Sequence, residues 1–218
     1  GLAVSWGVKR GIYSNEAGQG TGPHASSAAS VSHPAKQGLV QAFSVYVDTL
    51  LVCSATAFMI LITGSYNVVG PDNAPMFIGL KDVATGPAYT QAAVESLMPG
   101  FGQAFVAIAL FFFAFTTILS YYYISETNVS YINRKLHRPF LFFILKLFVM
   151  GSCIFGAVKT ADLAWAVGDI GVGLMAWLNI IAILLLNKKA FLCLRDYEKQ
   201  LAIGLDPVFH PEKLGIKN

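Results

Sequence analysis

Hydroxyl and aromatic side chains stand together in the apolar stretch FFFAFTTILSYYY, residues 111–123. Thr116 and Ser120 are four residues apart and would share one face of a helix, with Thr117 beside them. Hydroxyls and backbone carbonyls, here that of Phe113, are oxygen donors suited to a dehydrated alkali cation. The same hydroxyls could instead bond to the carbonyl one turn back or to a neighbouring helix. The pattern leaves both interpretations open.

Two acids lie inside apolar stretches. An acid at such a depth is costly and usually faces a cavity or a partner. For Asp48, a functional role and a structural pair with a basic residue fit equally well. Asp169 lies in the segment GDIGVG, where glycines allow close helix packing or a local break near a site. Packing is the favoured interpretation there.

Small residues dominate the segment RGIYSNEAGQGTGPHASSAA, residues 10–29. It is no phosphate-binding loop, because it lacks GxxxxGK[ST] and no strand precedes it. Glu16 could close a gate by pairing with a basic residue or be a solvated loop acid. His24 and His33 lack ligand partners at metal spacing. No nucleophile–base arrangement or paired-carboxylate motif is present, so the sequence does not predict an enzyme.

The composition places these residues in a membrane protein. Hydrophobic residues make up 55% of the chain and charged residues 12%, about half the charged fraction of a soluble domain. Four apolar runs are long enough to cross about 30 Å of hydrocarbon as helices. These runs are residues 39–64, 102–125, 139–158 and 163–186.

The basic residues set an orientation. They gather before the first run (Lys9, Arg10, Lys36), between the second and third (Arg134, Lys135, Arg138) and after the fourth (Lys188, Lys189, Arg195, Lys199). Residues 65–101 hold only Lys81, so the positive-inside rule puts this loop outside. The same rule predicts that residues 1–38 and the tail 188–218 are cytoplasmic. The net charge of +3 gives no reason to expect a nucleic-acid partner.

Several segments resemble one family. RGIYSNEAG at residues 10–18, followed by GQGTGP, resembles the signature of the alanine/glycine:cation symporters. FAFTTIL at residues 113–119 is similar to a second family motif, and Leu174-Met175-Ala176 with Asn179 to a third. The resemblance covers nearly the whole chain.

The resemblance implies an all-α membrane protein with the leucine-transporter-like fold of two inverted five-helix repeats. This chain would be its C-terminal fragment, with four transmembrane helices. The missing N-terminal half of the same protein would supply the broken helices that hold the substrate. The implied function is symport of alanine or glycine with sodium across the bacterial inner membrane. Proton-coupled uptake and a non-transporting sensor or scaffold are the alternatives.

The resemblance also implies site residues. Sodium, the coupling ion and the one cofactor-like ligand expected, would be held by the carbonyl of Phe113 and the hydroxyls of Thr116 and Thr117. Ser120 and Tyr121 would line the substrate pocket, where the family usually has Gly and Trp. A gating or structural motif would comprise Arg10, Asn15, Glu16, Gly18 and Asp48.

Overall fold

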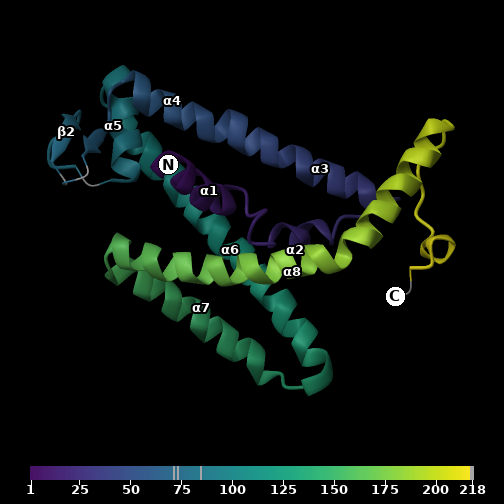
Figure 1. The fold of residues 1–218 in the computed structure, drawn as a ribbon. Helices are drawn as coiled ribbons and strands as arrows, with labels where there is room; N and C mark the ends of the chain where they lie inside the picture. The colour runs from purple at the N-terminus through teal and green to yellow at the C-terminus, as the bar shows by residue number, and fades with distance from the viewer. Residues whose placement is uncertain (71, 73, 84, 217–218) are drawn as a thin grey trace. The chain divides into compact units, whose positions relative to one another are not determined.

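The chain is mostly helical in a computed structural model that describes residues 1–70, 72, 74–83 and 85–216 (Figure 1). It divides into two compact units. One is Val47–Tyr123, and the other is Gly1–Tyr46 together with the chain from Ile124 onward. Only the long helix α6, Gly102–Leu136, and the first membrane-length helix pass from one unit to the other.

The first unit carries the helices that come before and after the long extracellular loop. Besides the end of α6, these are α1 (Leu2–Ser14), α2 (Gly22–Ser26), α3 (Pro34–Tyr46), α7 (Phe140–Val158), α8 (Ala161–Ala202) and a 3₁₀ turn, η2 (Pro211–Leu214). Within this unit α1 and α3 both contact α8. Gly204, with φ of 77°, follows the end of α8 and lets the chain turn back.

The second unit begins inside a membrane-length helix. It holds η1 (Val47–Cys53), α4 (Ser54–Ile62), β1 (Asn67–Val69), β2 (Pro75–Ile78), α5 (Pro87–Leu97) and α6 up to Tyr123. η1 is a π-helix, and the Ser54 hydroxyl donates to the carbonyl of Thr49, five residues back, at 3.1 Å. Asp48 lies in this π-helix, with the Cys53 thiol 3.8 Å from its carboxylate. Short π segments inside α-helices often lie at functional sites.

The four predicted membrane helices are confirmed, with different ends. The helices long and apolar enough to cross a membrane are Pro34–Ile62, Gly102–Leu136, Phe140–Val158 and Leu163–Ala202. Two of them run well past the predicted spans, because no Gly or Pro interrupts the polar residues after 125 or after 186 until Pro139 and Gly204. Most apolar side chains on these helices are exposed, such as Ile62 at 83% and Leu185 at 75%, as expected for faces that meet lipid or further helices.

The description as all-α needs one correction. β1 pairs antiparallel with β2 inside the predicted extracellular loop, with Asn67 opposite Ile78. β-branched and aromatic residues favour these strands. The Asn67 side chain stabilises the hairpin, because it donates to the Leu80 carbonyl at 2.7 Å and accepts from the Leu80 N–H at 2.9 Å.

Glu95 of α5 fixes the start of α6. Its carboxylate accepts hydrogen bonds from the backbone N–H of Gly100 at 2.5 Å and of Gln103 at 3.4 Å. The N–H groups of a first helical turn lack partners within the helix, so an acid there is favourable. These bonds, that of Gly100 above all, hold the pKa of Glu95 below its usual value.

Glu95→Gln should therefore lower the thermal unfolding midpoint of the full-length protein in detergent by a few degrees at pH 7. The folded-state pKa is lowered, so the stabilisation is present above the usual pKa and is lost as pH falls through the folded value. The difference from wild type should vanish below about pH 4. Glu198→Gln, an exposed acid on α8, is the control; an unchanged midpoint for Glu95→Gln at pH 7 would contradict the capping role.

Candidate functional site

The strongest candidate site is the interruption between α1 and α2, residues 15–21, referred to below as the break. α1 ends at Ser14 and α2 begins at Gly22. Glu16 and Gly20 have left-handed backbones, with φ of 59° and 77°. Non-glycine residues rarely adopt this conformation, and where they do the site is often functional.

Side chains of the break bond within it. The Asn15 carboxamide oxygen accepts from the N–H of Ala17 at 3.2 Å. The Thr21 hydroxyl donates to the Glu16 carboxylate at 2.6 Å, and the N–H of Gly20 donates to the Glu16 carbonyl at 3.1 Å. The structure thus gives Glu16 a hydroxyl partner inside the break. Of the two interpretations of this acid, neither the gate nor the solvated loop residue describes that contact.

Asn179 of α8 holds the break from outside. Its side-chain amide donates to the carbonyls of Ala17 at 3.0 Å and Gly18 at 3.1 Å. The contact is close: a Cβ added to Gly20 would lie 2.5 Å from the Asn179 carboxamide oxygen. A Cβ on Gly18 would lie 2.7 Å from the Ile12 side chain. The glycines of the motif therefore admit α8 on one side and α1 on the other.

Nearer the start of α8, Asp169 pairs with the basic residues of α1. The Lys9 ammonium is 2.5 Å and the Arg10 guanidinium 3.6 Å from its carboxylate. The Arg10 guanidinium also lies over the Trp165 ring, 4.7 Å from its centroid, and Tyr13 packs edge-on against Trp165. A partly buried acid in an apolar helix thus has two cations to balance it.

The packing interpretation of the GDIGVG segment agrees with the structure. α8 continues unbroken through these residues. A Cβ on Gly168 would lie 2.6 Å from the Tyr13 hydroxyl. The absence of a side chain at Gly168 is what lets α1 approach α8 at this level.

The contacts to α8 follow a single order along the chain. Arg10 meets Asp169, the break meets Asn179, and His33 meets Asp196 at 3.3 Å. An α-helix rises 1.5 Å per residue, so these levels are separated by about 15 Å and about 25 Å. Residues 9–33 therefore run alongside α8 in the same direction (Figure 1).

The residues predicted to bind sodium and substrate lie on consecutive turns of α6, in the second unit. The Thr116 hydroxyl donates to the carbonyls of Phe112 at 2.9 Å and Phe113 at 3.1 Å. This is the backbone-bonded alternative, and it leaves the hydroxyl oxygen's lone pairs available to a cation. Thr117 and Ser120 are exposed on the same helix, with Tyr121 half-buried. A sodium site here stays a prediction.

The described residues hold no group of three or more His, Cys, Asp or Glu side chains that could bind a metal ion. Oxygen ligands for a hard monovalent cation would therefore come from hydroxyls and carbonyls such as those of α6.

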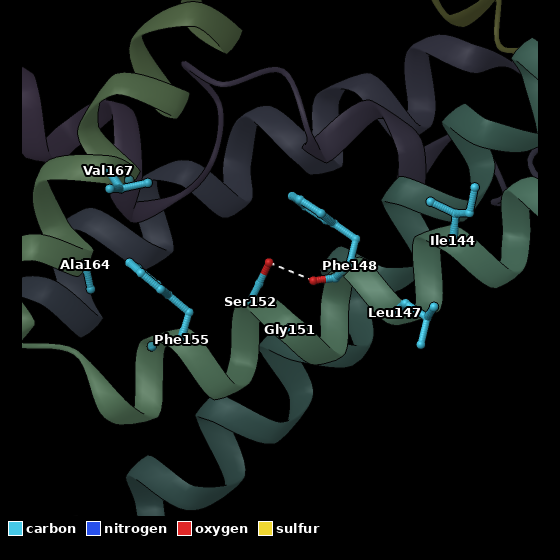
Figure 2. A pocket seen from close by; sticks show the side chains of 10 residues that line it. Ile144, Leu147, Phe148, Gly151, Ser152, Phe155, Ala164 and Val167 are labelled. Atoms are coloured by element: carbon cyan, nitrogen blue, oxygen red, sulfur yellow. Dashed lines mark hydrogen bonds between the residues drawn. The ribbon is translucent and has the colours of Figure 1, made fainter.

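A groove of about 730 Å³ between α7 and α8 has a different chemistry (Figure 2). Phe148, Phe155 and Val167 point into it. Its Ser152 hydroxyl donates to the Phe148 carbonyl at 2.9 Å, so both of these polar groups are already bonded. The groove offers hydrocarbon rather than polar partners, and it does not suit a charged solute.

Sequence patterns alone missed the partners of the break. Asn179 entered only through a family motif, although a carboxamide in an apolar helix is itself a signal for interhelical hydrogen bonding. Lys9 was counted only for its charge, and Trp165 reads as an interfacial residue. Their pairing with α1 and α8 required the structure.

Four membrane-length helices and an interrupted helix clamped to a continuous one define a multi-pass helical membrane protein of the transporter class. The chain belongs to the sodium:alanine symporter family, whose profile matches residues 1–211. Members are transporters, which agrees with the lack of an enzymatic motif.

Named relatives agree with the family. The putative sodium/proton-dependent alanine carrier protein YrbD of Bacillus subtilis (strain 168) is 63% identical over 218 residues, 100% of this chain and 45% of the relative. The sodium/proton-dependent alanine carrier protein of Bacillus sp. (strain PS3) is 61% identical, over 100% of this chain and 49% of the relative. The sodium/alanine symporter AgcS of Methanococcus maripaludis is 37% identical, over 86% and 38%.

The chain thus spans about half the length of the first two of these relatives. No solved structure matches the chain.

Asn179→Asp should destabilise the full-length protein. The change removes both N–H donors and turns a carboxylate toward the carbonyls of Ala17 and Gly18, at a cost of about 1–3 kcal/mol. Denaturant unfolding in detergent measures it. Asn187→Asp, on the same helix, is the matched control; equal effects of the two variants would contradict the clamp.

Gly20→Ala should cost at least about 1 kcal/mol, since its positive φ disfavours a side chain and its new methyl group would meet Asn179. Asn179→Ala removes the carboxamide from that contact. In a double-mutant cycle the pair should therefore cost less than the sum of the single variants. Strict additivity would show that the two residues do not touch.

Proposed function

We propose that the protein to which this chain belongs is a secondary transporter that carries alanine or glycine together with sodium across the bacterial inner membrane. Family membership and the named alanine carriers support this function. The observation that carries it is the break in a helix held against the apolar stretch of α8 by Asn179. An interrupted helix at membrane depth is a typical substrate site of transporters.

The position of the break supports its place within the bilayer. Asn179 is four to five residues from the middle of the apolar stretch 163–186, or about 7 Å along the helix axis. The charge pattern predicts a cytoplasmic position for all of residues 1–38. We propose instead that α1 and the break lie inside the membrane, and that only the residues near His33 and Lys36 reach the cytoplasmic side. The carboxyl end of α8 would also be cytoplasmic.

The break supplies what a zwitterionic amino acid needs. Irregular backbone is tolerated at membrane depth only where it is buried in protein or lines a cavity. Its amide and carbonyl groups are not all used in helical hydrogen bonds, so some can bind a carboxylate or an ammonium group. The carboxyl end of α1 adjoins the break, and its partial negative charge favours a cation or an ammonium group there.

We propose that sodium binds on α6, through the Phe113 carbonyl and the hydroxyls of Thr116 and Thr117, and that Ser120 and Tyr121 contribute to the substrate pocket. The remaining half of the same protein would complete both sites, in a leucine-transporter-like fold with its inverted repeat. Coupling requires that sodium and the amino acid each raise the other's affinity by the same factor.

Proton coupling is the second candidate, because two of the relatives are named sodium/proton-dependent. Alanine uptake into liposomes containing the full-length protein separates the two. A sodium gradient at equal pH should drive uptake, and a proton gradient without sodium should not. Binding of sodium and alanine without any uptake would instead favour a sensor.

Thr117→Ala tests the ion site. Loss of one oxygen ligand should raise the sodium concentration for half-maximal uptake about tenfold, which corresponds to about 1.4 kcal/mol. Thr56→Ala is the matched control, since Thr56 is an exposed hydroxyl of a membrane helix bonded to the carbonyl of Val52 at 3.3 Å. Equal sodium dependence in both variants would sink the proposed site.

A further inference from the structure

The chain beyond α8 turns back and binds the loop that precedes α3. This segment, residues 204–210, is called the strap. The strap's Val208 forms two hydrogen bonds with the Gln200 side chain of α8, at 2.9 Å and 3.0 Å. The Phe209 N–H donates to the Ser32 carbonyl and the Ser32 hydroxyl donates to the Pro207 carbonyl, both at 2.9 Å. Main-chain and side-chain bonds thus join three segments.

His33 is enclosed where the three segments meet. Its side chain is 0% exposed and lies between the rings of Tyr197 and Phe209, with centroids 5.5 Å and 5.4 Å away. The His33 Nδ1 atom accepts from the N–H of Ala35 at 3.1 Å. The ring proton therefore sits on Nε2, which donates to the Asp196 carboxylate at 3.3 Å.

Two further contacts complete the network. The Gln200 amide donates to the same Asp196 oxygen as His33, at 2.8 Å. Lys36, in the first turn of α3, bonds the Ser32 hydroxyl at 2.7 Å and pairs with Asp206 of the strap at 2.5 Å. A buried polar side chain with both ring nitrogens bonded holds its neighbours in one arrangement.

We propose that the strap is a brace that fastens the start of α3 to the carboxyl-terminal extension of α8, so that these two helix ends move as one body. It does not depend on the proposed transport function. Its consequence for the break is specific: the chain between the break and α3 is fixed at Ser32 and His33, so any displacement of α2 relative to α3 is taken up by the residues before Ser32.

Distance measurement between two spin labels on the full-length protein tests the brace. The labels replace Val40 of α3 and Phe191 of α8, which are both exposed, in a background without other cysteines. The unaltered strap should give one narrow distance distribution, identical with and without sodium and alanine. His33→Ala should at least double its width, because the ring that fills the junction is lost.

His210→Ala is the matched control, since this histidine lies at the end of the strap and is exposed; it should leave the width unchanged. A milder variant guards against a folding defect. Lys36→Asp should broaden the distribution by reversing one charge of the Lys36–Asp206 pair, and adding Asp206→Lys should narrow it again.

Three results would overturn the brace: a shift of the distance in the unaltered strap on addition of sodium and alanine, an unchanged width in His33→Ala, or no narrowing in the Lys36/Asp206 charge exchange. Because the readout is a distance, it is decided separately from whether the protein transports alanine.

Discussion

The two hydrogen bonds from the Asn179 side chain to the carbonyls of Ala17 and Gly18 are the interaction on which the site depends. A helix that stops within an apolar region frees backbone groups, and each buried group without a partner costs free energy. Asn179 offers two donors on one rigid carboxamide, which satisfies two consecutive carbonyls. Glycine at position 20 leaves room for that carboxamide, so motif and helix are complementary.

α8 acts as a common support with three chemically different levels. Asp169 binds cations of α1, Asn179 binds backbone of the break, and Asp196 binds the neutral His33. Acid, amide and acid each match the groups they meet, because a charge in an apolar setting needs a countercharge whereas a carbonyl needs only a donor. The order of these levels gives the first 33 residues a direction along α8 and supports the proposed depth of the break.

The hydroxyls of α6 illustrate why a residue type alone does not decide a role. Thr116 bonds to its own helix, as threonines in apolar helices commonly do. That bond uses the hydroxyl proton and leaves the oxygen able to face a cation, so the structural and the ion-binding interpretations are compatible for this residue. The π-helix around Asp48 is a comparable case, since a local irregularity marks a segment without naming its ligand.

The sequence by itself determined the four apolar helices, the charge asymmetry and the family, because hydropathy, charge and motif are properties of contiguous residues. It could not determine where helices continue into polar residues, nor the hairpin within the loop. Only the tertiary structure decided that Asn179 clamps a segment 162 positions away and that His33 meets an acid 163 positions away. Such pairs depend on how helices pack side by side, and packing brings together residues whose separation along the chain carries no signal.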